Sequence, residues 1–134
     1  MKVDGTPFKT ERGAFKNHPC TVWAAEKEEN CAWLIQHACA LCDEFELRFG
    51  KPHGLSKSLF EAKKLFHRST GSAIVCFRRV SGFARAMPEE FKYDTTIDDV
   101  TAYRRYLNHK GWCYDNYLRM PDRRPDWLLP KEND

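Results

Sequence analysis

The strongest pattern along the chain is a stripe of apolar residues between positions 29 and 49, spaced three and four apart. Residues at this spacing share one face of an α-helix, so we predict a helix over residues 29–49. Gly50, directly after the stripe, suits a left-handed cap at the helix end. The apolar face consists of Cys31, Leu34, Ile35, Ala38, Leu41, Cys42, Phe45 and Phe49.

A shorter helix is predicted ahead of this one, over residues 19–27. Proline suits the first turn of a helix because its φ is preset and its missing N–H would have no intrahelical partner there. Pro19 therefore marks the start, with Asn17 or His18 at the cap. The side chains expected to point inward are Val22 and Trp23.

Two further amphipathic stretches predict helices. The first starts near Leu55, where Ser58 and Glu61 have the spacing of a capping box. The second starts after Thr95 or Thr96, which suit a helix cap, and it ends or bends at Gly111. The apolar positions are Leu55, Leu59, Phe60, Ala62, Leu65 and Phe66 in the first, and Val100, Tyr103, Tyr106 and Leu107 in the second.

Between these two helices, residues 69–96 predict irregular structure. The Ile-Val-Cys-Phe run at 74–77 has a strand-like composition and predicts at most one short extended piece, because a lone strand has no pairing partner in a chain otherwise patterned for helices. From Pro121 onward, we expect an extended strap that docks Trp127 on the 29–49 helix.

These elements predict an all-α fold class. We expect a compact single-domain bundle of about four helices over residues 18–134, preceded by a polar tail at residues 1–17. A chain of 134 residues, 42% hydrophobic and 13% aromatic, suffices for one core and is neither disordered nor collagen-like.

The chain has no predicted membrane partner. No apolar run approaches the roughly 20 residues that cross a bilayer, and the first residues lack the apolar core of a signal peptide. We therefore expect a cytoplasmic protein whose six cysteines are free thiols.

Charge is distributed unevenly behind a net charge of only +3. Residues 51–88 contain eight basic residues and a single acidic one, Glu61. Basic residues clustered among serine, glycine and aromatic residues are typical of proteins that bind nucleic-acid phosphates. We therefore predict a nucleic-acid-binding surface. Its phosphate contacts are Lys51, Lys57, Lys63, Lys64, Arg68, Arg78 and Arg79, and its nearest pocket is lined by Arg48, His53 and His18.

Three alternatives stay open for these residues. The basic surface could be a solvated face balanced by acidic residues elsewhere, or it could bind an acidic protein partner. His18 either binds an anion at the start of a helix or simply caps the turn.

A second stripe on the 29–49 helix carries candidate catalytic residues. His37 and Glu44 lie two turns apart and would present an imidazole and a carboxylate to one ligand, as general acid–base catalysis requires. Alternatively, Glu44 and Arg48 form an i,i+4 ion pair with His37 at its edge. The sequence favours the ion pair.

The spacing Cys39-x-x-Cys42, with His37 as a third ligand, invites a metal or redox interpretation. Redox pairs of this kind sit at helix N-termini, whereas these two cysteines lie in the middle of a predicted helix. A structural zinc site needs a second ligand pair at matching spacing, and the sequence has none. Motifs for nucleotide phosphates and for hydrolase nucleophiles are absent as well. No metal or cofactor is therefore predicted.

Several short blocks stand out together: His18-Pro19-Cys20-x-x-Trp23, Trp33-Leu34, the pattern LCxEFxxRFGKxH at 41–53, Ala86-Met87-Pro88-Glu89-Glu90-Phe91 and Ala102-Tyr103-Arg104. They resemble a family of small, mostly uncharacterised bacteriophage proteins, over about residues 17–127.

Two four-residue blocks, Pro88-Glu89-Glu90-Phe91 and Arg124-Pro125-Asp126-Trp127, are also similar to the C-terminal half of phage pyrimidine-dimer DNA glycosylases. This resemblance implies a compact all-helical DNA repair fold. Enzymes of that family use the amine of an N-terminal Thr, freed by Met removal, with an assisting Glu. The chain begins Met1-Lys2, and a bulky second residue blocks Met removal, so we expect the catalytic apparatus to be missing.

The leading hypothesis is therefore a small phage-type DNA-interacting protein in the host cytosol, with binding favoured over catalysis. The first alternative is a phage protein that binds and inhibits a host defence protein, with Trp112, Tyr114 and Tyr117 as exposed anchors. The second alternative is a DNA base-modifying or base-excising enzyme that uses Glu44 and His37.

Overall fold

The computed structural model describes residues 15–71 and 80–130, and over these residues the protein is helical with no strand. Four helices have eight residues or more: α1 (Pro19–Glu26), α2 (Glu28–Phe49), α3 (Ser56–Thr70) and α5 (Asp99–His109). Two single-turn helices, α4 (Glu89–Lys92) and α6 (Trp112–Asp115), and a 3-10 helix, Pro121–Arg123, follow the same order along the chain. The predicted all-α class with about four main helices is confirmed.

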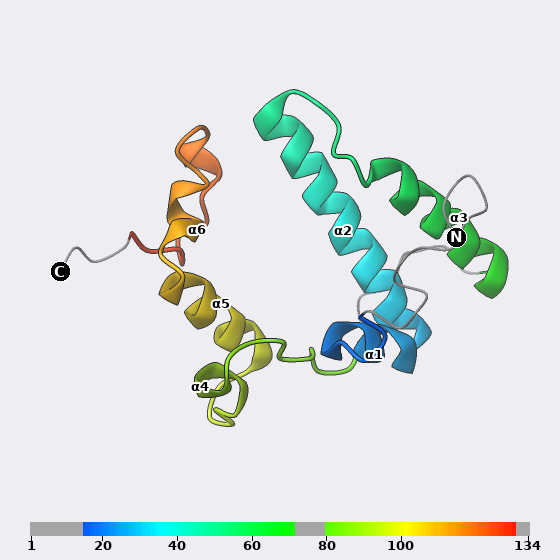
Figure 1. The fold of residues 1–134 in the computed structure, drawn as a ribbon, viewed down its shortest axis with the longest axis horizontal. Helices are drawn as coiled ribbons and strands as arrows, with labels where there is room; N and C mark the ends of the chain where they lie inside the picture. Colours follow the sequence, from blue (N-terminus) through cyan, green and yellow to red (C-terminus); the bar gives the residue numbers. More distant parts are fainter. Residues whose placement is uncertain (1–14, 72–79, 131–134) are drawn as a thin grey trace.

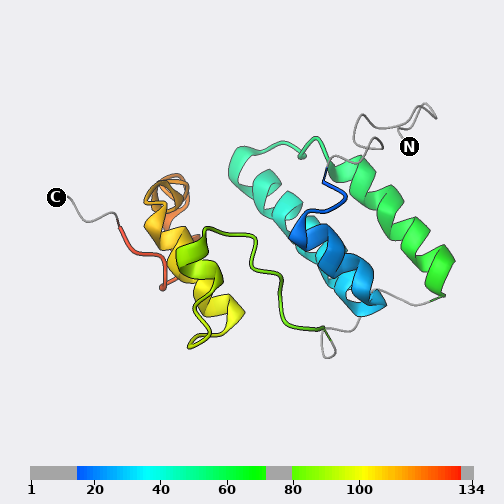
Figure 2. The same cartoon turned by 60° about the horizontal axis from the view of Figure 1, so that its bottom comes forward.

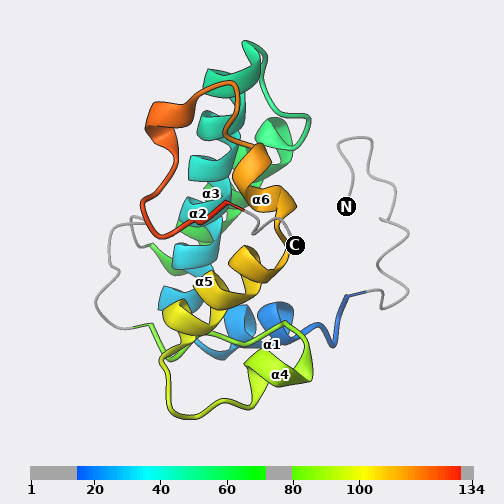
Figure 3. The same cartoon turned by 90° about the vertical axis from the view of Figure 1, so that its left-hand side faces the viewer.

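The helices form two groups that lie side by side (Figure 1). In one group α1 and α3 pack on α2, and in the other α4 and α6 pack on α5. The segment from Val80 to Pro88 crosses from the α1 end of the first group to α4, as Figure 2 shows. Seen from the side, α5 and α6 lie in front of α2 (Figure 3). The two groups thus face each other across one interior.

The ends of α1 and α2 follow the sequence prediction. His18 is the N-cap of α1, where its Nδ1 accepts a hydrogen bond from the backbone N–H of Cys20 at 3.2 Å, and Pro19 occupies the first turn. Gly50 ends α2 with a φ of 66°, in the left-handed region, and its N–H donates to the Glu46 carbonyl. A residue with a side chain would strain the backbone at this position.

The helix predicted to start near Leu55 does so, but the predicted caps of α3 and α5 were wrong. α3 begins at Ser56 after Leu55, which makes no side-chain cap, so Ser58 lies inside the helix and forms no capping box. α5 is capped by Asp98, whose carboxylate accepts from the backbone N–H of Thr101 at 2.8 Å. Thr96 cannot fill this role because its N–H and hydroxyl both donate to Asp94.

The described part of the segment predicted as irregular, 69–96, includes helical residues at two places. Its first residues belong to α3 and its last turn forms α4, whereas the extended piece predicted at 74–77 lies outside the described residues. Arg85 stabilises the described residues that precede α5. Its guanidinium donates to Asp99 at 2.7 Å and to the carbonyls of Phe91, Asp94 and Ile97. Arg85 belongs to the basic sequence window, but its charge is used inside the fold.

The first group is centred on buried aromatic and polar side chains. Trp23 is only 5% exposed and meets Trp33 edge-on, with ring centroids 5.8 Å apart, while Phe83 packs against both rings. Beneath them Asn30 is fully buried and donates to the Trp23 carbonyl at 2.8 Å. Asn30 also bonds Ser81, which fastens the Val80–Pro88 segment to α1 and α2.

Apolar periodicity overstated how much of each helix is buried. Val22 and Val100, both expected to point inward, are exposed, as are Phe60 and Leu65 of α3. The reason for α3 is that it packs on α2 alone among the described helices, so a narrow face suffices.

The C-terminal strap contacts both helices: Arg123 at its start reaches Glu44 of α2, whereas Trp127 lies on α5 and not, as predicted, on α2. The Asn108 side chain of α5 donates to the Trp127 carbonyl and accepts from the Leu129 N–H, both at 2.9 Å. Leu128, between them, is buried.

Candidate functional site

Three residues of the predicted basic surface lie on the side of α3 that faces away from α2. Leu59, Ala62 and Phe66 are at least partly buried, since this side of the helix packs on α2, whereas Lys57, Lys64 and Arg68 are exposed. Residues seven and four apart share one helical face, so these three basic side chains form a line along α3. We call Lys57, Lys64 and Arg68 the α3 basic stripe.

Further groups flank the α3 basic stripe. Lys51, in the turn before α3, and Lys63 are exposed as well. Phe60 is 58% exposed, and the Lys64 ammonium lies 4.4 Å from its ring centroid. The single acidic residue of α3, Glu61, lies within the stripe, between Lys57 and Lys64, and pairs with Lys64 at 3.2 Å in an exposed i,i+3 ion pair. The surface therefore combines an excess of positive charge with an exposed aromatic ring.

The three residues predicted to line an adjoining pocket do not come together. His18 caps α1, which packs near the start of α2, whereas Arg48 and His53 lie at its other end (Figure 1). His53 Nδ1 accepts from the backbone N–H of Leu55 at 3.1 Å, and its ring meets Phe45 edge-on. His18 thus caps a helix, as the alternative interpretation had it. Arg78 and Arg79 lie outside the described residues.

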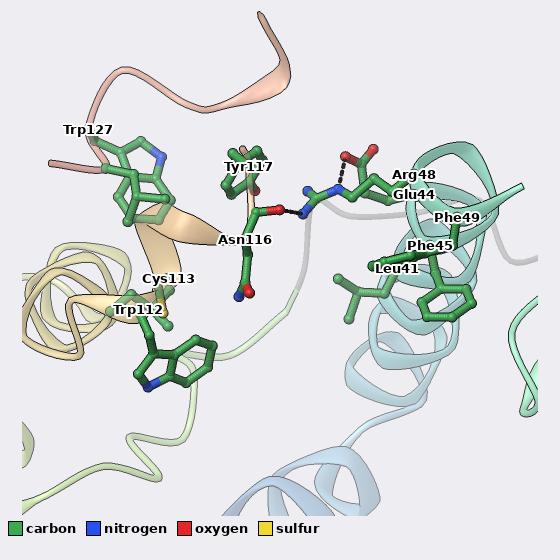
Figure 4. A pocket seen from close by; sticks show the side chains of 12 residues that line it. Leu41, Glu44, Phe45, Arg48, Phe49, Trp112, Cys113, Asn116, Tyr117 and Trp127 are labelled. Atoms are coloured by element: carbon green, nitrogen blue, oxygen red, sulfur yellow. Dashed lines mark hydrogen bonds and ion pairs between the residues drawn. The ribbon is translucent and has the colours of Figure 1, made fainter. Parts of the chain in front are cut away.

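Arg48 connects α2 to the C-terminal part of the chain. Its Nε donates to Glu44 at 2.7 Å, its Nη1 donates to the Asn116 carbonyl at 3.3 Å, and its guanidinium lies 4.0 Å from the Tyr117 ring centroid. Figure 4 shows the side chain bridging the two elements. Arg48 therefore contacts protein groups on each side and is not presented to a polyanion.

Glu44 is held by two arginines. Arg123 donates to both carboxylate oxygens, at 2.5 to 3.1 Å, and Arg48 adds the i,i+4 ion pair that the sequence favoured. Hydrogen bonds from Arg123 and Arg48 lower the pKa of Glu44 from 4.5 to about 2. A carboxylate with so low a pKa is a weak base, which makes it poorly suited to general acid–base work near pH 7.

His37, two turns before Glu44 on α2, has different neighbours. Its ring stacks on Trp33 with centroids 4.8 Å apart, and burial lowers its pKa. Glu44 lines a cavity of about 380 Å³ between α2 and α6, whereas His37 lines an adjoining cavity of about 490 Å³ between the two helix groups. The two candidate catalytic residues therefore line different cavities, and Glu44 is already engaged by two arginines.

Sequence reasoning missed two arginines, Arg119 and Arg123, that contact side chains near the end of α2. Arg123 reaches Glu44 across 79 residues of sequence, and the Arg119 guanidinium lies 5.2 Å from the Phe49 ring centroid at the end of α2. The sequence feature that could have indicated them is the group of arginines at 119–124, which lies outside the basic stretch at residues 51–88.

The described residues show no metal-binding constellation. No three His, Cys, Asp or Glu side chains gather there at ligand spacing, and Cys39 and Cys42 are half-buried free thiols. None of the described helices is long and apolar enough to cross a membrane.

No protein-family model, curated protein or solved structure matches this chain. The resemblance to phage proteins therefore stays a prediction, and function has to be argued from the arrangement of the side chains.

Proposed function

We propose that the protein binds nucleic acid, with DNA as the expected target, through the α3 basic stripe and the lysines beside it. The observation that carries the proposal is the alignment of Lys57, Lys64 and Arg68 on the side of α3 that faces away from α2. Lys64 alone of the three pairs with a carboxylate, Glu61, among the described residues, and that pair is exposed. Exposed pairs of this kind contribute little, so a phosphate can replace Glu61.

The length of the stripe suits a phosphate backbone. Lys57 and Arg68 are eleven residues apart, which corresponds to about 16 Å along a helix rising about 1.5 Å per residue. Consecutive phosphates of one DNA strand are spaced about 3.4 Å along the duplex axis, so the stripe matches about four to five of them. Lysine and arginine side chains at this spacing replace condensed counterions, and binding then weakens as salt concentration rises.

The alternatives have less support. Of the three aromatic anchors expected for a host-protein inhibitor, Trp112 is 56% exposed, but Tyr114 and Tyr117 are partly buried. A base-modifying enzyme would need Glu44 and His37 at one ligand, and they line different cavities.

Fluorescence anisotropy with labelled DNA tests the proposal, using single-stranded and duplex oligonucleotides over a range of salt concentrations. For the wild-type protein, the logarithm of the binding constant is expected to fall linearly with the logarithm of the salt concentration. The triple variant Lys57→Gln, Lys64→Gln, Arg68→Gln should flatten this slope by about 2 to 3, because each lost phosphate contact removes about 0.7 to 0.9.

The matched control removes the same amount of charge elsewhere, by Lys27→Gln, Lys92→Gln and Arg105→Gln, all exposed and none on α3. This variant should keep most of the salt dependence. Equal losses in both variants would mean that only net charge matters, and the α3 surface would then be the wrong site. Binding whose affinity does not change with salt concentration would overturn the proposal altogether.

A further inference from the structure

A second candidate site lies in the interior between the two helix groups. The cavity of about 490 Å³ is walled by Trp23 of α1, Trp33 of α2, Phe83, Tyr103 of α5 and Trp127 of the strap. Small-molecule sites occupy about 300 to 1,000 Å³ and combine apolar, aromatic walls with a few polar groups. The size and the lining of this cavity fit that description.

A positively charged side chain lies at this cavity. Arg104 lines it and lies 5.4 Å from the Trp127 ring centroid, and no carboxylate of the described chain pairs with it. The next residue, Arg105, differs on both counts, since it pairs with Asp94 at 3.3 Å and does not line the cavity. The lining includes no Asp or Glu, so the only fixed charge at the cavity is positive.

We propose that this cavity binds a planar aromatic carboxylate. The ring packs among Trp33, Phe83 and Trp127, and the carboxylate oxygens engage the Arg104 guanidinium. A guanidinium matches a carboxylate in a two-pronged geometry, and aromatic rings prefer offset or edge contacts such as these walls offer. The site is independent of the nucleic-acid proposal, because α3 lies on the opposite side of α2 (Figure 1).

The test is a calorimetric titration of the full chain with 2-naphthoate and, in parallel, with the neutral 2-naphthamide. We expect saturable one-to-one binding of 2-naphthoate. Arg104→Gln should weaken this binding at least about tenfold, as the loss of a hydrogen bond to a charged group does, and should leave 2-naphthamide unaffected. The neighbouring variant Arg105→Gln is the matched control and should bind 2-naphthoate like the wild type.

Circular dichroism of Arg104→Gln and Arg105→Gln checks that the fold persists in both variants. Thymidine 5′-monophosphate carries a planar base and a phosphate: tighter binding than 2-naphthoate with the same dependence on Arg104 would overturn the carboxylate and assign the site to nucleotides. The absence of saturable binding of either anion overturns the proposal. Equal affinity for 2-naphthoate and 2-naphthamide, or equal behaviour of the two arginine variants, overturns it as well and favours an uncharged apolar occupant.

Discussion

Asn30 and Ser81, 51 residues apart in sequence, hold each other through two hydrogen bonds. The Asn30 Nδ2 donates to the Ser81 hydroxyl at 2.8 Å, and the Ser81 backbone N–H donates to Asn30 Oδ1 at 3.1 Å. The same amide group donates to the Trp23 carbonyl, and Asn30 is fully buried. One side chain therefore fastens α1 and the segment that leads to α4 onto α2.

Removing this side chain is expected to destabilise the whole fold. Asn30→Ala leaves the Trp23 carbonyl and the Ser81 N–H without partners, and each buried orphan costs about 1 to 3 kcal/mol, so we expect a loss of about 3 kcal/mol. Ser81→Ala removes only the hydroxyl and should cost about 1 kcal/mol. Urea unfolding measures both, with the exposed Asn17→Ala as a control within about 0.5 kcal/mol of wild type. Similar midpoints for Asn30→Ala and Asn17→Ala would contradict the tethering role.

Arg85 plays a comparable part in the second helix group, and its role depends on the shape of the guanidinium. Arg85→Lys keeps the charge but cannot serve Asp99 and three backbone carbonyls together, because an ammonium is a compact group with three donors. We expect a loss of about 2 kcal/mol in unfolding free energy, from carbonyls left without a donor. Arg105→Lys, at an exposed ion pair, should cost less than about 0.5 kcal/mol. Equal costs for the two variants would show that Arg85 acts only through its charge.

The periodic part of the fold was predictable from the sequence. α2 was expected at 29–49 and spans Glu28–Phe49, because its three-and-four spacing is long and Gly50 supplies an unambiguous end. Pro19 marked α1 equally well. The caps of α3 and α5 were missed: α3 has no side-chain cap at all, and near the start of α5 several residues could cap a helix, so only the folded chain shows that Asp98 is the acceptor.

The tertiary contacts were beyond the reach of sequence reasoning. Nothing local indicates that Asn30 meets Ser81, that Arg85 closes the segment ahead of α5, or that Arg123 reaches Glu44. Each pairs a polar residue with a partner that only the chain path brings close. The sequence identified the charged groups of the candidate site, but Arg48, His53 and His18 are used within the fold, which leaves the lysines of α3 and Arg68 as the exposed part.

Glu44 should make stability sensitive to acid. Because Arg123 and Arg48 lower its pKa to about 2 in the folded protein, its contribution is complete above about pH 4.5 and disappears as the pH falls toward 2. The gap in unfolding midpoint between wild type and Glu44→Gln should therefore be widest near pH 7 and close between pH 4.5 and 2. Glu46→Gln is the control, since Glu46 is exposed on the same helix and forms no ion pair among the described residues. A difference in unfolding midpoint that stays constant down to pH 2 would contradict the stabilising contact of Glu44 with Arg48 and Arg123.

Phe60 predicts which form of nucleic acid the α3 surface prefers. The ring is 58% exposed beside Lys64, and an exposed aromatic ring between basic side chains can stack on an unpaired base but has no access to bases within a duplex. Phe60→Ala should therefore weaken binding of a single-stranded oligonucleotide by about 1 to 3 kcal/mol and change duplex binding little.

Leu65→Ala offers a matched control, because Leu65 is 59% exposed on the same helix and has no ring to stack. Anisotropy titrations of the two variants at one fixed salt concentration compare them directly. If Leu65→Ala loses as much single-strand affinity as Phe60→Ala, or if Phe60→Ala weakens duplex binding equally, base stacking is not the reason that Phe60 is exposed.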